Sequence, residues 1–304
     1  MDTEARYRLL AASPFTRTDS SGLVTEARGG KLREIFHRRE LLGLLVRRDL
    51  QARYRDSVLG FLWTVIRPII VFVMYFVVLG KFLRAAEGVP DFAVYLFAGL
   101  TLYSFFSEMV VGSASSIIAN AGLVKKIYLP REIFPLASVG GAAVMFLIQC
   151  GVLLAAALIF GALPDDLFQT LWFFPSVALI LVYGVALGIF LAAVNVYLRD
   201  VQYLLELLIM LAMWASPIVY SWQMAASAFA SFNLPSWLFE VYLNSPVTLG
   251  VLGFHRAFWG SGTAADYPSH LGLRILIAFV VGLILMFFAH RVFKRLQGNF
   301  AQEL

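Results

Sequence analysis

The chain has 304 residues, of which 60% are hydrophobic and 14% charged, and its mean hydropathy is +0.79. Soluble domains carry about 25% charged residues, so this composition excludes an ordinary soluble protein and predicts repeated membrane crossing. The net charge of +5 does not indicate a nucleic-acid partner. Twelve of the 24 Lys and Arg residues precede Trp63 and most others flank apolar runs, as topology signals and anionic-lipid contacts do.

The first segment, 1–30, is polar and mixed in charge, and we expect a disordered cytosolic tail without a cleavable signal peptide. The single cysteine, Cys150, lies in an apolar run and supports neither a disulfide framework nor a cysteine metal site. The four histidines are scattered without metal-ligand spacing, so no metal is expected.

Residues 31–61 are predicted to form an amphipathic helix on the membrane surface that bends at Ser57–Gly60 into the first apolar run. At 100° per residue, one imperfect apolar stripe forms over 31–56, with Leu41, Leu44 and Leu45 off it. The residues of the stripe are Leu32, Ile35, Phe36, Leu42, Val46, Leu50 and Tyr54.

The remainder predicts an all-α integral membrane domain over 62–294 and a cytosolic C-terminus over 295–304. The expected spans are six, because a crossing needs roughly 20 apolar residues. They are 62–83, 92–118, 133–161, 171–196, 203–221 and 272–293.

Charge then predicts the orientation. With the N-terminus inside, 19 Lys and Arg residues fall on the cytoplasmic side and 4 on the outer side, which is a strong positive-inside signal. Both termini are therefore expected in the cytoplasm.

A charged segment and two acidic residues are further candidates for function. The charged stretch 123–132 is either an ordinary loop or a short docking helix, and its apolar Ile127, Tyr128 and Leu129 favour docking. Glu108, inside a span, needs a partner or a wet path, whereas Glu206 is expected to pair with Arg199.

The aromatic stretch 214–246 is interrupted by three prolines and predicts re-entrant helices on the outer side, between the fifth and sixth spans. Its rings either form an interfacial belt or line an exit path, and the residues leave both readings open. No phosphate-binding G-x-x-x-x-G-K-[ST] loop and no G-x-S-x-G elbow occurs, so catalysis by this chain is not expected.

Three stretches together resemble the membrane subunit of ABC type-2 polysaccharide exporters, which include O-antigen, capsule and teichoic-acid permeases. They are RRDLQARYRDSVLGFLWTVIRPI at 47–69, LVKKIYLPREIFPL at 123–136 and NVYLRDVQYLLELLIMLAMWASPIVYS at 195–221. LNSPVT at 243–248 is similar too, and the resemblance covers about residues 31–304.

The resemblance implies a half-transporter in a bacterial inner membrane. Two copies of the chain would form the channel for a polyprenyl-diphosphate-linked polysaccharide, and two copies of a separate ATPase would bind ATP and Mg. The chain itself would hold no cofactor.

The resemblance also assigns roles to residues. ATPase coupling falls on Val124, Lys125, Lys126, Ile127, Tyr128, Leu129, Pro130, Arg131 and Glu132. The gate, with its lipid head-group site, falls on Arg47, Arg48, Arg53, Tyr54 and Arg55, because arginine forms charge-assisted bonds with phosphate. The channel and exit aromatics are Phe105, Phe106, Trp214, Tyr220, Trp222 and Trp237.

Two alternatives remain. The chain could belong to an ABC type-2 exporter of a smaller lipid or drug. It could also be a membrane enzyme acting on polyprenyl-linked sugars, for which the outer segments offer only Glu240, His255, Arg256, Asp266 and His270.

Overall fold

The computed structural model describes residues 39–53, 59–82, 84, 88–126, 129–164 and 166–304, and all regular structure in these ranges is helical. The chain divides into two compact units, 1–40 and 41–304, and nearly all of the first lies outside the described residues. The membrane-embedded architecture is therefore that of the second unit.

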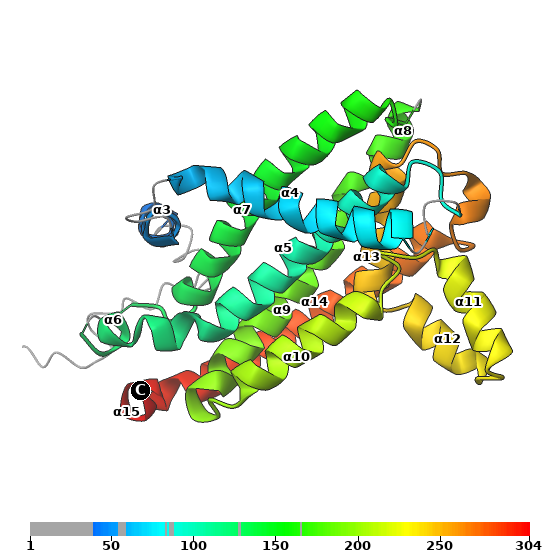
Figure 1. Cartoon of the computed structure of the whole chain (residues 1–304). Helices are drawn as coiled ribbons and strands as arrows, with labels where there is room; N and C mark the ends of the chain where they lie inside the picture. Colours follow the sequence, from blue (N-terminus) through cyan, green and yellow to red (C-terminus); the bar gives the residue numbers. More distant parts are fainter. Residues whose placement is uncertain (1–38, 54–58, 83, 85–87, 127–128, 165) are drawn as a thin grey trace, which may run out of the picture. The chain divides into compact units, whose positions relative to one another are not determined.

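The main helices follow one another with short connections (Figure 1). They are α3 (Arg39–Arg53), α4 (Trp63–Tyr75) continued by the π-helical η2 (Phe76–Phe82), α5 (Phe92–Ala119), α6 (Ala121–Lys126), α7 (Ile133–Phe160), α8 (Leu167–Thr170), α9 (Phe173–Tyr197), α10 (Val201–Trp214), α11 (Trp222–Ser231), α12 (Ser236–Leu243), α13 (Pro246–Phe258), α14 (Leu271–Leu296) and α15 (Phe300–Glu303). Short 3-10 turns cover Gly60–Leu62, Ala264–Asp266 and Gln297–Asn299.

Five helical segments are long and apolar enough to cross a membrane, so the chain is a multi-pass membrane protein. They are Trp63–Phe82, Phe92–Ala119, Ile133–Phe160, Phe168–Tyr197 and Ala264–Asn299. Each contains or overlaps one of the spans expected from the sequence.

The expected span at 203–221 differs. Its helix, α10, has 14 residues, which at 1.5 Å per residue reach about 21 Å, short of the roughly 30 Å of hydrocarbon. The helix ends at Trp214 because Pro217 follows and cannot donate a backbone hydrogen bond. Helix length alone therefore supports five spans and a shorter apolar helix.

Helix α5 is the centre of the second unit. It packs against α7, α9 and α13, and α14 packs on the α9 side, as the neighbouring ribbons in Figure 1 show. Most of the buried apolar side chains in this part belong to one core around α5, including Leu96, Leu102 and Met109.

A second apolar core lies where α6 and α15 meet the ends of α5, α7, α9 and α14, and we call it the α6-end cluster. Its buried members are Leu45, Ile117, Val124, Ile133, Phe134, Ala137, Ile189, Ala192, Ala193, Val196, Phe293 and Phe300. The opposite end of the bundle carries α8, α11 and the connection between α13 and α14, and we call it the α11 end (Figure 1).

The entry to the first span bends at Gly60, whose φ of +46° lies in the left-handed region that favours glycine. The expected bend at Ser57–Gly60 is thus present at its last residue, whereas Ser57 and Val58 lie outside the described residues.

Candidate functional site

The segment expected to dock a partner begins as α6, which follows α5 after the single residue Asn120. Val124 is buried in the α6-end cluster, and the neighbouring Lys125 and Lys126 are exposed. The apolar side of the helix therefore anchors it, and the two ammonium groups are presented to the surroundings.

Residues 129–132, at the end of the segment, are not helical, and α7 begins at Ile133. Leu129 packs half-buried on the α6-end cluster, and the Arg131 guanidinium lies 5.6 Å from the centre of the Phe300 ring. Glu132 is 4% exposed, and its Oε1 has no hydrogen-bond partner. Pro130 is half-buried, and Ile127 and Tyr128 lie outside the described residues.

Helix α3 is held to this end by the apolar side chains of Leu41, Leu42, Leu45 and Val46 and by two polar contacts. Leu45 is buried in the α6-end cluster, although the expected apolar stripe excluded it. Arg48 donates from Nη2 to Asn120 Oδ1 over 2.6 Å. Arg53 Nη1 lies 3.7 Å from Glu108 Oε2.

These contacts divide the expected gate residues. Arg48 has a partner in Asn120, directly after α5, and Arg53 has one in Glu108 on α5, whereas Arg47 is exposed and makes no ion pair with any described residue. Tyr54 and Arg55 lie outside the described residues. Glu108 thus pairs with Arg53 of α3. The charge of this carboxylate is therefore met without a chain of further acidic residues through the bundle.

The expected pairing of Glu206 with Arg199 is wrong. Both residues are described, and no ion pair joins them. Glu206 instead lies on the exposed side of α10 and makes no ion pair with any described residue.

The structure does not gather the expected exit aromatics in one place. Phe105 is buried and stacks on Phe146 with 4.4 Å between ring centres, and Phe106 is buried in the same core. Trp214 and Trp237 are exposed. Tyr220 donates its hydroxyl to the Trp214 carbonyl over 2.8 Å.

At the α11 end, a polar network ties α12 to the start of α14. Arg274 Nη1 lies 2.8 Å from Glu240 Oε2 and 2.9 Å from Asn244 Oδ1. The hydrogen bond from Arg274 is the main cause that lowers the pKa of Glu240, and Asn244 Nδ2 donates to the same carboxylate over 2.8 Å.

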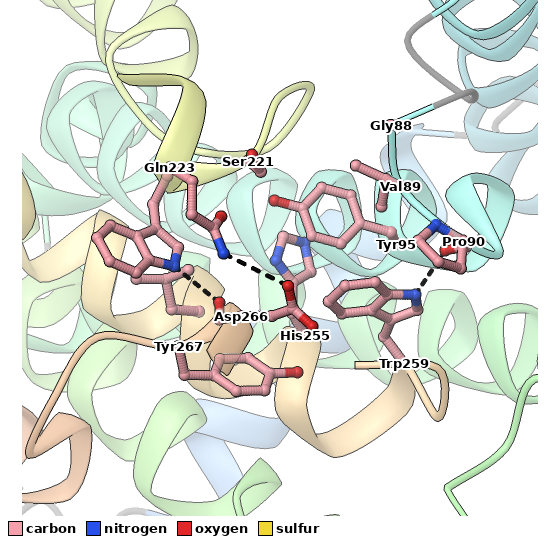
Figure 2. A pocket seen from close by; sticks show the side chains of 12 residues that line it. Gly88, Val89, Pro90, Tyr95, Ser221, Gln223, His255, Trp259, Asp266 and Tyr267 are labelled. Atoms are coloured by element: carbon pink, nitrogen blue, oxygen red, sulfur yellow. Dashed lines mark hydrogen bonds between the residues drawn. The ribbon is translucent and has the colours of Figure 1, made fainter. Parts of the chain in front are cut away.

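A pocket of about 230 Å³ opens at the same end (Figure 2). Four separate segments bring its side chains together: α5, the start of α11, α13 and the turn at Ala264–Asp266. The lining residues are Gly88, Val89, Pro90, Tyr95, Ser221, Trp222, Gln223, Leu252, His255, Trp259, Asp266 and Tyr267.

Hydrogen bonds fix the walls of this pocket. Trp222 Nε1 donates to the Asp266 carbonyl and Trp259 Nε1 donates to the Pro90 carbonyl, each over 2.7 Å. Both indole rings are thereby held in place, and Gln223 reaches towards the Asp266 carboxylate (Figure 2).

His255 forms the floor of the pocket. It is fully buried on α13, which is not one of the five spanning segments, and its ring stacks on Tyr95 with 3.8 Å between centres. Burial lowers the pKa of His255 to about 3, so the imidazole is neutral. Neither ring nitrogen has a hydrogen-bond partner.

Sequence reasoning named His255 and Asp266 only as members of the enzyme alternative and passed over Tyr95, Gln223, Trp259 and Tyr267. These residues are 172 positions apart at the extremes, and no local spacing connects them. A tryptophan directly after the apolar helix that carries a histidine, as in HRAFW at 255–259, is a local signal that could have pointed to the pocket.

Together, the apolar helices, the basic segment with its exposed Lys125 and Lys126, and the α3 contacts define a multi-pass membrane protein with a charged surface at one end. A comparison with known families is decisive here: residues 40–259 match the ABC-2 type transporter family. The chain belongs to this family and is a membrane transport component, as expected, rather than an enzyme.

Three curated proteins are similar in sequence to most of this chain. It is 27% identical over 266 residues to an O-antigen export system permease protein RfbA of Klebsiella pneumoniae, covering 87% of this chain and 95% of that protein. An RfbA of Myxococcus xanthus is 34% identical over 193 residues, or 62% of this chain and 71% of that protein. The capsule polysaccharide export inner-membrane protein CtrC of Neisseria meningitidis serogroup B is 25% identical, with 82% and 90% covered.

Proposed function

We propose that this chain is the channel-forming half of an ATP-driven exporter that moves a polyprenyl-diphosphate-linked polysaccharide out of the cytoplasm. The observation that carries the proposal is the family match over residues 40–259 together with relatives named for O-antigen and capsule polysaccharide export. A separate ATPase supplies the energy, since the sequence holds no phosphate-binding loop.

In the proposed orientation, the α6 end faces the cytoplasm and both chain termini lie there. The support is the 19-to-4 distribution of Lys and Arg, with Lys125, Lys126, Lys294 and Arg295 all at this end. The short α10 and the helices α11, α12 and α13 form the outer vestibule, and α10 with its flanking residues completes a sixth crossing.

The ATPase docks on the segment Val124–Glu132. Val124 and Leu129 fix the segment to the α6-end cluster. A displacement of the exposed lysines is therefore transmitted to α5 and α7, the helices before and after the segment. A docked ATPase drives transport only if it favours one channel state over another, so the α6-end cluster is the element that must shift.

Arg47 is the best-placed arginine for the diphosphate head group. Arg48 and Arg53 are engaged by Asn120 and Glu108, whereas the Arg47 guanidinium is exposed and keeps all its donors for phosphate oxygens. Arg47→Lys keeps the charge but removes bidentate geometry, and it is expected to slow export more than a phosphate-independent step such as membrane insertion.

A second copy of the chain completes the channel. Exposed apolar side chains run along α4 and α10, which need a covering of lipid or protein. On α10 they are Tyr203, Leu204, Leu207, Leu208, Met210, Leu211 and Trp214.

The test is co-purification from membranes in mild detergent. The tagged chain is expected to bring down an ATPase in near-equal amount, and Lys125→Glu with Lys126→Glu is expected to release it. Lys294→Glu with Arg295→Glu is the matched control, because it reverses two exposed charges at the same end outside the docking segment.

Loss of the ATPase from the first double variant alone supports docking at α6. An ATPase that stays bound to both double variants would remove the segment from the interface. A chain that purifies alone would contradict the proposed half-transporter.

A further inference from the structure

The pocket at the α11 end combines aromatic faces with neutral hydrogen-bonding groups. Tyr95, Trp222, Trp259 and Tyr267 contribute rings, and Trp259 meets Tyr95 edge-on with 5.1 Å between centres (Figure 2). Ser221 and Gln223 stand among them with hydroxyl and amide groups. Ligand pockets commonly have this pattern of apolar walls and a few orienting polar groups.

The pocket also contains polar groups that the protein itself leaves unsatisfied. Within the part of the chain that the structure describes, neither nitrogen of the fully buried His255 has a hydrogen-bond partner, and the buried Tyr267 hydroxyl has none either. An unsatisfied buried polar group costs about 1–3 kcal/mol, so such groups call for a partner that the folded chain does not supply. A neutral imidazole offers one donor and one acceptor, which a hydroxyl group matches on both counts.

Charge restricts the class of ligand. Among the described residues, the lining contains no Lys or Arg and one carboxylate, Asp266, which accepts from Thr263 and Gln223. Arg256 is close, but its guanidinium packs between the rings of Trp172 and Tyr267, at 4.5 and 5.4 Å from their centres. A phosphate or carboxylate would meet a negative wall without a compensating cation.

Size restricts the ligand further. The volume of about 230 Å³ is below the roughly 300–1,000 Å³ of pockets for drug-sized ligands, so it admits one small ring and not a chain. We propose that this pocket binds a single neutral sugar unit, with its apolar face on the aromatic rings and its hydroxyl groups on His255, Gln223 and Tyr267. The sugar comes either from the exported glycan or from free saccharide outside the membrane.

Only the first of these sources rests on the proposed function. Binding of a sugar to the isolated chain needs neither the ATPase nor transport. The binding test can therefore fail while the ATPase still co-purifies, and the two proposals are separately testable.

The experiment uses the full chain in detergent, without ATPase. Intrinsic tryptophan fluorescence, to which Trp222 and Trp259 contribute from the pocket, is titrated with methyl glycosides of glucose, mannose and galactose. Glucose 6-phosphate and N-acetylneuraminic acid are the anionic comparators, and glycerol controls for any effect of a simple polyol. Oligosaccharide fragments ending in the same sugar test the glycan as the source.

The expected result is saturable binding of at least one neutral glycoside, at least tenfold tighter than the anionic sugars and glycerol. Gln223→Ala is expected to weaken it at least tenfold. Gln169→Ala is the matched control, because it removes a half-buried amide on α8 at the same end but outside the pocket. If a fragment binds more tightly than the methyl glycoside of its terminal sugar, the exported glycan is the source. If the two bind equally, free saccharide is the source.

The variant His255→Phe separates a role in sugar binding from a purely structural role of this histidine. Replacing an unsatisfied polar group by an apolar ring is expected to leave the melting temperature unchanged or raised while sugar binding is lost. No saturable signal with any neutral glycoside would overturn the proposal. So would equal binding of the anionic sugars, or Gln223→Ala binding as tightly as the unmodified chain.

Discussion

Helix α4 with its continuation η2 (Trp63–Phe82, here the α4 segment) and helix α5 are both long and apolar enough to span a membrane, yet the structure buries them to very different extents. Their most apolar windows have mean hydropathies of 2.0 and 1.5, but 6% of the α4 window is buried in the protein against 78% of the α5 window. The less apolar helix is the central one. Hydropathy therefore identifies the membrane-spanning segments, but it does not predict which of them is buried inside the protein.

The reason lies in the polar groups of α5. Ser113 donates from Oγ to the Pro135 carbonyl over 3.1 Å, and Asn195 Nδ2 donates to the Ala114 carbonyl over 2.9 Å. In lipid such groups must be satisfied by neighbouring protein, so a span that carries them is drawn inward. The exposed surface of α4 is mostly apolar, with Arg67 as an exposed charge, and lipid or another copy can cover the apolar part.

The largest effect that tests this contrast is truncation in the core. Leu102 on α5 is fully buried, so Leu102→Ala is expected to cost about 2–5 kcal/mol of stability. Ile70→Ala on α4 removes a similar side chain that is 57% exposed in the isolated chain, and is expected to cost about 0.5 kcal/mol or less there. Thermal unfolding of the monomer in detergent measures both, and equal losses would contradict the contrast.

The next effect concerns close helix contact. A Cβ at Gly188 on α9 would lie 2.7 Å from Ser113 Cβ on α5, so Gly188→Leu is expected to destabilise the chain by about 1–3 kcal/mol. Gly151→Leu on α7 is the control, because nothing lies within 4 Å of its Cβ position. A matching drop in melting temperature for both variants would argue against tight packing of α9 on α5.

A smaller effect belongs to the α11 end and depends on pH. The pKa of Glu240 is lowered below 4.5 by Arg274, so the folded state binds this proton less readily than the unfolded state. The stabilisation is present above about pH 4.5 and is lost as the pH falls through the lowered pKa. Because the pair is largely exposed, it contributes less than about 1 kcal/mol.

Glu240→Gln should flatten that part of the stability profile between pH 3 and 6. The measurement is the melting temperature of both proteins across this range. An unchanged acid slope in the variant would assign the slope to other carboxylates.

The smallest effect concerns α3. Removing both polar contacts with Arg48→Ala and Arg53→Ala is expected to leave the melting temperature nearly unchanged, because both side chains are half-exposed. Amide hydrogen exchange in α3 should quicken, since only the apolar contacts of Leu41, Leu42, Leu45 and Val46 then hold the helix. Unchanged exchange would mean that the apolar contact suffices.

Sequence reasoning placed the long apolar runs well because length and composition alone define a span. The expected 92–118 became Phe92–Ala119, and 133–161 became Ile133–Phe160. It overestimated 203–221, where apolar composition continues past the end of a helix that stops at Trp214. Periodicity also missed Leu45, because burial there depends on α6 and α7 and not on the stripe of α3 itself.

The sites were harder to predict than the spans. The basic segment at 123–132 could be singled out since its unusual residues are contiguous. The pocket at the α11 end could not, because Tyr95, Gln223, His255 and Asp266 meet only after four distant segments fold together.

The most direct test of the central claim is reconstitution of the chain with its co-purifying ATPase in lipid vesicles loaded with a polyprenyl-diphosphate-linked glycan. The proposed exporter should make a long glycan accessible on the far side of the membrane in an ATP-dependent manner, and Lys125→Glu with Lys126→Glu should abolish this. ATP-dependent movement of small lipids with no movement of the polymer would contradict the account.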